Sequence, residues 1–150
     1  MIRKISTFEP LNNYNQAIVK LKKNGIRPTK QRMVLAKLLF EKGDRHISAE
    51  EIFDEIKKED RKISLATIYN TLKQFTKVGL LKELVVDQNK SIYCTNHDPH
   101  YHLYIEDEGK VIDIPQENID LNIPSIPACL SLHNVDVVVR VRTLKEKFKN

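Results

Sequence analysis

The chain has 150 residues, of which 41% are hydrophobic, so it is long enough for one domain or two small ones with a real core. Its apolar runs are short, and no apolar segment follows the charged N-terminus. We therefore expect neither a membrane span nor a secretion signal, and a cytoplasmic location. The net charge of +5 is mildly basic and suits a partner such as nucleic acid.

The first half of the chain predicts four helices. The first is short and amphipathic and ends at residues 24–25, where Asn-Gly gives a good left-handed stop. Thr29 is the expected N-cap of the second helix. Ser48, with Glu51 three residues later, forms a capping box that begins the third. Ser64 caps the fourth, whose buried face would consist of Ile68, Leu72 and Phe75.

Two alternating strands follow at residues 80–86 and 90–95, and residues 87–89 suit the hairpin turn between them. Helices followed by a hairpin predict a winged helix-turn-helix domain over residues 1–95, with the fourth helix as the recognition helix. Its exposed polar side chains would reach base edges, thymine methyl groups and phosphates. These candidate DNA contacts are Thr67, Tyr69, Asn70 and Lys73. On a generic helix such residues are ordinary surface positions, but the order of elements and the basic charge favour DNA contact.

Three of the five histidines lie within residues 97–102. Alternate side chains of a strand share a face, so His100 and His102 could direct two imidazoles at one metal ion or haem iron. Neutral imidazole is the commonest metal-ligating side chain. His97 is either a spare ligand or an exposed residue, and we favour the exposed position.

The cysteines limit the kinds of site. Cys94 and Cys129 are the only two, and neither is part of a Cys-x-x-Cys pair. Two cysteines cannot form a structural zinc site of four cysteines within one chain, and a disulfide framework is not expected in the cytoplasm.

Five ordered motifs run from about Leu21 to Arg142. They read GIRPTKQR at 25–32, HISAEEI at 46–52, SLATIYNTL at 64–72, GLL at 79–81, and HYH with GKVID at 100–113. Together they resemble the signatures of the ferric uptake regulator superfamily, whereas any one alone would be weak.

Four further segments are most similar to the iron response regulator, the haem-responsive branch of this superfamily. They are residues 42–46, 69–76, 111–115 and 135–142. The resemblance implies an iron- or haem-responsive transcriptional regulator, not an enzyme, that controls genes of haem synthesis and iron homeostasis. The alternative is a metal or peroxide sensor of the same superfamily that depends on Fe, Mn or Zn.

The resemblance also implies an α+β fold, in which the winged helix is followed by a small α/β dimerisation and sensing domain over residues 96–150. A homodimer with two-fold symmetry would bind a pseudo-palindromic operator in double-stranded DNA. By position, Tyr69 and Asn70 match the major-groove readers, and Arg27 matches a basic residue that enters the minor groove. Many relatives carry Arg in place of Asn70. Because Asn pairs with adenine and Arg with guanine, we expect an A·T-leaning operator.

The regulatory metal site of the superfamily joins its two domains, and the matching positions are His46, His100, His102 and Asp113. A further carboxylate ligand usually precedes the His-x-His motif by six or seven residues, where this chain has Cys94 or Tyr93. Cys94 could bind as a thiolate, which would favour a softer metal or haem iron. It could equally be a small buried residue at the end of a strand.

Two kinds of bound group are possible at this site, haem and a divalent metal ion. The branch implies haem, but the chain lacks a Cys-Pro haem motif, so haem would be bound through His100 and His102, with His97 or Tyr101 as further candidates. The His and Asp side chains suit Fe(II), Mn(II) or Zn(II) equally well. A catalytic metal is disfavoured, because no general acid or base accompanies the histidines.

Overall fold

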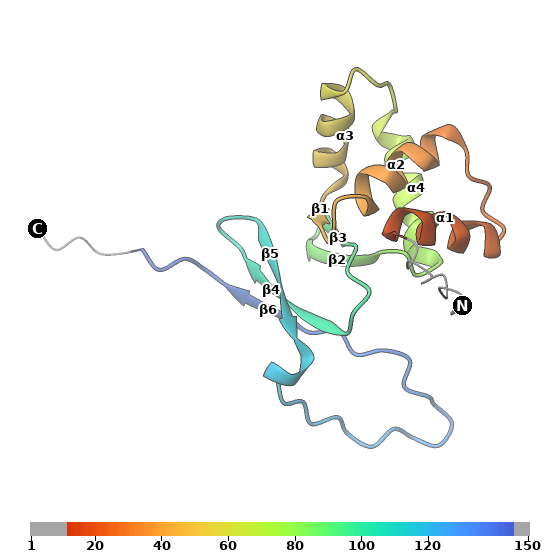
Figure 1. Ribbon diagram of the computed structural model, residues 1–150. Coiled ribbons are helices and arrows are strands. Elements are labelled where there is room, and N and C mark those ends of the chain that lie inside the picture. The colour runs from red at the N-terminus through yellow and green to blue at the C-terminus, as the bar shows by residue number, and fades with distance from the viewer. Residues whose placement is uncertain (1–11, 146–150) are drawn as a thin grey trace, which may run out of the picture. The chain divides into compact units, whose positions relative to one another are not determined.

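The computed structural model describes residues 12–145, and the chain divides into two compact units after His97 (Figure 1). Each unit has its own sheet, and each is described separately below. None of the helices within residues 12–145 is long and apolar enough to cross a membrane.

Within residues 12–97 the first unit has four helices, and the three for which an N-cap was predicted begin at that cap. They are α1 (Asn13–Lys23), α2 (Lys30–Phe40), α3 (Ala49–Lys58) and α4 (Leu65–Lys77). The side chains of Thr29 and Ser64 accept the backbone N–H groups three residues on, and Ser48 and Glu51 form the complete capping box. After α1, Gly25 has φ of +70°, the left-handed conformation that glycine adopts without strain.

One apolar core joins the four helices. Its largest fully buried side chains come from every helix and include Leu21, Leu35, Leu39, Ile52, Ile56, Ile68, Leu72 and Phe75. The predicted buried face of α4 is therefore confirmed, and burial of that face leaves the opposite side of α4 at the surface.

A three-stranded antiparallel sheet completes the first unit. It consists of β1 (His46–Ile47), β2 (Lys82–Asp87) and β3 (Lys90–Cys94) in the order β1-β3-β2. The β2–β3 hairpin turns at Gln88 and Asn89, as predicted. The sequence did not predict β1, which lies between α2 and α3.

The second unit is a three-stranded sheet in the order β5-β4-β6. Strands β4 (His100–Ile105) and β5 (Lys110–Pro115) form an antiparallel hairpin, whereas β6 (Val138–Val141) is parallel to β4. A parallel pair needs a long connection, which here includes one short 3₁₀ helix, η1 (Gln116–Asn118), followed by an extended loop (Figure 1).

The mixed α+β fold class is confirmed. Within residues 98–145, however, the only helical element is η1, although an α/β unit was expected there. Pro124 and Pro127 explain part of the difference, because proline lacks the backbone N–H that a helix interior requires.

Candidate metal centre and DNA-reading helix

Three potential ligands of the second unit meet on one face of its sheet. His100 and His102 are alternate residues of β4, and Asp113 is the register partner of His102 on β5. The two Nε2 atoms lie 2.9 Å apart, and Asp113 Oδ1 lies 3.3 Å from His100 Nε2 and 3.5 Å from His102 Nε2. Both imidazoles are buried. Strand alternation thus produces the juxtaposition that the sequence predicted.

A backbone contact fixes the tautomer of His100. Its Nδ1 lies 2.5 Å from the carbonyl oxygen of Asp98, and a carbonyl can only accept a hydrogen bond. Nδ1 therefore carries a hydrogen, and Nε2 is the ring nitrogen directed toward His102 and Asp113. Metal-ligating histidines usually have such a partner on the other ring nitrogen. No side-chain pattern in the sequence indicated this role of the Asp98 carbonyl.

The donor set fits a divalent ion. Ligand atoms about 2.0–2.1 Å from one ion lie roughly 3.3 Å apart at tetrahedral angles, close to the separations among His100, His102 and Asp113. The fit to haem is poorer for the same pair of histidines. Two axial ligands bind from opposite sides of the porphyrin plane, whereas these Nε2 atoms are in hydrogen-bonding contact.

In the first unit, His46 and Cys94 are register partners in the β1–β3 pairing. Directly opposed residues of antiparallel strands have their side chains on the same face. Tyr93 pairs instead with Ile47 and is directed to the other face, where both pack into the helical core. Of the two positions that could replace the usual carboxylate, only Cys94 therefore shares a face with His46.

The surroundings of Tyr93 also disfavour a role as a ligand. Burial and, to a lesser extent, the nearby carboxylate of Glu83 raise the pKa of Tyr93 to about 12. The phenol therefore remains protonated at neutral pH, whereas a strong metal–oxygen bond would require the phenolate.

The two remaining candidate ligands, His97 and Tyr101, belong to different units. The ring of His97 stacks on Phe40 with the centroids 6.4 Å apart. Tyr101 lies between His100 and His102 in β4, so its side chain points to the opposite face of that sheet. Tyr101 therefore does not share the face on which His100, His102 and Asp113 meet.

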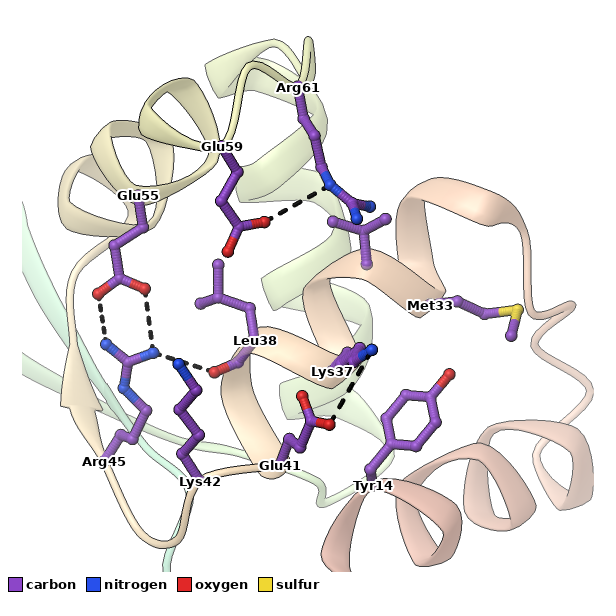
Figure 2. A pocket seen from close by; sticks show the side chains of 11 residues that line it. Tyr14, Met33, Lys37, Leu38, Glu41, Lys42, Arg45, Glu55, Glu59 and Arg61 are labelled. Atoms are coloured by element: carbon purple, nitrogen blue, oxygen red, sulfur yellow. Dashed lines mark hydrogen bonds and ion pairs between the residues drawn. The ribbon is translucent and has the colours of Figure 1, made fainter.

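A cavity of about 380 Å³ lies among α1, α2 and α3, and its charged walls are largely self-neutralised (Figure 2). The Arg45 guanidinium donates to both oxygens of Glu55, at 2.5 and 3.1 Å, and to the Leu38 carbonyl at 3.0 Å. The backbone N–H of Arg45 donates to the Thr95 hydroxyl, and the Arg45 carbonyl accepts from the Thr95 N–H. These contacts fix the residue before His46 and so hold β1 in register with β3.

The predicted DNA contacts of α4 lie on its outer side. Tyr69, Asn70 and Lys73 are exposed, and Thr67 is half-buried, with its hydroxyl 2.8 Å from the Ser64 hydroxyl. The phenol of Tyr69 donates a hydrogen bond to Glu50, a residue of α3.

A single side chain connects the two elements that are expected to bind DNA. Arg27 is exposed in the turn before α2, and its carbonyl accepts a 2.7 Å hydrogen bond from Arg32 Nη1. Arg32 Nε donates at 3.1 Å to the side chain of Gln74 on α4. The Arg27 turn is therefore linked to the recognition helix.

Residues 23–140 match the ferric uptake regulator family. The chain belongs to this family. It is 32% identical over 120 residues to the peroxide-responsive repressor PerR of Staphylococcus saprophyticus, covering 80% of this chain and 79% of that protein. The superfamily resemblance is thus confirmed, and the similarity to the iron response regulator branch stays a prediction.

Solved structures of the family agree with this assignment. The ferric uptake regulator of Vibrio cholerae superimposes with a TM-score of 0.65 at 27% identity, covering 86% of this chain and 98% of that one. A zinc-bound manganese uptake regulator gives a TM-score of 0.60, also at 27% identity, covering 85% and 98%. Members of the family are dimeric DNA-binding proteins that regulate transcription.

Proposed function

We propose that this family member is a transcriptional regulator that responds to a divalent metal ion and binds operator DNA as a homodimer. The observation that carries the proposal is the convergence of His100, His102 and Asp113 within hydrogen-bonding distance of one another on one sheet. Imidazole and carboxylate groups suit Fe(II), Mn(II) and Zn(II). The similarity to a zinc-bound manganese uptake regulator supports an ion of this kind.

We infer that His46 is a fourth ligand, as the family resemblance implies. One ion held by His46 and by the β4–β5 cluster would fix the arrangement of the two units and hence the spacing of the two recognition helices in a dimer. Because half-site spacing in the operator is geometric, a change in that arrangement alters DNA affinity. The ion supplies charge and directional bonds, and the protein supplies the ligands.

The proposed operator contacts are those of the first unit. Asn70 and Tyr69 of α4 would read bases, Lys73 and Thr67 would contact the backbone, and Arg27 would enter the minor groove. The expected site is pseudo-palindromic and A·T-leaning.

We propose that the second unit, which lies within the predicted domain of residues 96–150, is the dimerisation domain. Its long connection exposes several large apolar side chains, namely Leu121, Ile123, Ile126, Leu130 and Leu132. Exposed apolar residues that gather in one segment are typical of a protein–protein contact. Burial of this segment against a second copy would remove it from water.

The metal dependence is tested with two matched histidine variants. An operator selected in vitro is titrated with protein in the presence of Mn(II), Zn(II), Fe(II) or haem, alongside direct measurement of bound metal. We expect His100→Ala to lose both bound metal and metal-dependent DNA affinity. His133→Ala removes an exposed histidine outside the cluster and should change neither. Equal metal binding by both variants would refute the site.

A peroxide response is a second candidate function, because the PerR relatives are 32–36% identical to this chain. In such a sensor His46 and His100 would be among the residues that hold Fe(II), and peroxide would oxidise one of these two histidines. Mass spectrometry of the Fe(II)-loaded and Zn(II)-loaded proteins after peroxide treatment tests this. Oxygen incorporated at a ligand only in the iron form supports it, and an unchanged iron form rules it out.

The predicted haem response is addressed by an absorbance titration. A Soret shift lost in His100→Ala and His102→Ala together would support haem binding through these histidines. A shift that survives both substitutions would show that haem, if bound, uses other residues.

A further inference from the structure

A carboxylate touches the tyrosine that is proposed to read DNA. The Tyr69 phenol donates its hydrogen to Oε1 of Glu50, which lies in the first turn of α3. Both residues are exposed, and Tyr69 keeps 39% of its surface accessible. A negative charge at this position is unexpected beside a surface that is proposed to approach phosphates.

The neighbouring acid, Glu51, has a different role. Its carboxylate accepts from the Ser48 backbone N–H at 2.7 Å and from the Ser48 hydroxyl at 3.0 Å, and so completes the capping box. Helix capping therefore accounts for Glu51 and leaves the contact of Glu50 with Tyr69 to be explained.

We propose that Glu50 is a specificity-determining residue that acts by positioning Tyr69. This inference rests on the proposed role of α4 as the recognition helix. A phenol has one hydrogen to donate, and while Glu50 accepts it the hydroxyl cannot donate to a DNA phosphate. The ring is then held across the α3–α4 interface, and its edge remains available for an apolar contact such as a thymine methyl.

The charge of Glu50 has a separate effect, on the affinity for any duplex. Non-specific complexes obtain nearly all of their affinity from phosphate contacts, whereas specific complexes add base contacts. A carboxylate near the backbone weakens both by a similar factor, so the ratio of the two affinities reports the positioning of Tyr69. The hydrogen bond to Glu50 raises the pKa of Tyr69, so the phenol keeps its proton at neutral pH.

The test compares Glu50→Gln with Glu51→Gln in the full-length protein. Both variants remove one charge from the same helical turn, but only the first alters the contact with Tyr69. Affinity is measured for the selected operator and for a scrambled duplex of equal length. We expect Glu50→Gln to bind the scrambled duplex roughly fivefold more tightly, the effect of one unit charge at a solvated interface, and the operator less so. The ratio of the two affinities therefore falls, whereas Glu51→Gln leaves it near the wild-type value.

Tyr69→Phe separates positioning from charge. In that background Glu50→Gln should still tighten binding to the scrambled duplex but should no longer lower the ratio. An equal ratio for Glu50→Gln and Glu51→Gln would overturn the inference while operator binding by the wild type stands. Failure of the wild type to prefer any duplex would overturn the proposed function as well.

Discussion

Cys94 lies directly opposite His46 in the antiparallel pairing of β3 with β1, so the thiol and the imidazole share one face of the sheet. The side chain of Cys94 is buried, while the other cysteine, Cys129, is exposed. A thiolate beside a proposed histidine ligand would change the preference of the site, because sulfur favours Zn(II) over Mn(II).

We expect Cys94 to ligate the ion together with His46. Cobalt(II) bound in place of the native ion should then show a near-ultraviolet charge-transfer band from sulfur to cobalt. Cys94→Ser should remove the band and Cys129→Ser should leave it unchanged. Cys94→Asp, which restores a carboxylate, should shift the preference toward Mn(II). A band unaffected by Cys94→Ser would show that this thiol is a buried structural residue.

The choice between Cys94 and Tyr93 shows what the sequence could and could not predict. A position known only to within one residue is ambiguous in a strand, because a shift by one residue moves the side chain to the other face. The deciding element, β1, has two residues and no hydrophobic pattern of its own, so its register became visible only in the structure.

The helix starts were predictable because the interactions that determine them are local in the sequence. Thr29, Ser48 and Ser64 each accept a backbone N–H three residues ahead, so the whole interaction lies within four residues of sequence. The hydrogen bond from His100 to the Asp98 carbonyl is also local, but no side-chain pattern marks a backbone acceptor. The long connection before β6 likewise depends on a parallel pairing that no local motif specifies.

Loss of the capping hydroxyl of Ser48 should destabilise the first unit. The Ser48 side chain accepts from the Glu51 backbone N–H and interacts with the Glu51 carboxylate. Ser48→Ala should lower the free energy of unfolding by about 1 kcal/mol, measured by urea denaturation followed by circular dichroism. Ser125→Ala, a substitution at an exposed serine of the second unit, should leave it within experimental error.

The buried phenol of Tyr93 predicts a loss of stability in alkali. Its pKa is raised from 10.0 to about 12, so the unfolded chain loses this proton at lower pH than the folded protein does. The contribution is fully present below pH 10 and is lost as pH rises toward 12. Since one pKa unit corresponds to ~1.4 kcal/mol, the loss should reach up to about 3 kcal/mol.

The measurement is the free energy of unfolding between neutral pH and pH 12, compared with that of Tyr93→Phe. The difference between the two proteins isolates this phenol from the other alkaline titrations. Parallel curves for the two proteins would contradict the assignment.

The hydrogen bonds of Arg32 to the Arg27 carbonyl and to Gln74 predict that it couples the minor-groove and major-groove contacts. Arg32→Ala should therefore weaken operator binding, and Arg27→Ala should cost less affinity in that background than in the wild type. Lys30→Ala, which removes an exposed charge from the same turn, should weaken binding without this coupling. Additive effects of the Arg27 and Arg32 substitutions in a double-mutant cycle would show that Arg32 does not act through Arg27.

The exposed amide of Asn70 predicts the base preference of the operator. An asparagine side chain donates to and accepts from adenine at N7 and N6, whereas arginine pairs with guanine at O6 and N7. Asn70→Arg should therefore shift the preferred base from adenine toward guanine at one position of each half-site, with a discrimination of about 1–3 kcal/mol. Lys73→Gln, which changes a proposed phosphate contact on the same face of α4, should weaken binding to all sequences alike and reduce its salt dependence. In vitro selection from a randomised duplex library measures both outcomes, and an unchanged preference in Asn70→Arg would mean that Asn70 does not read a base.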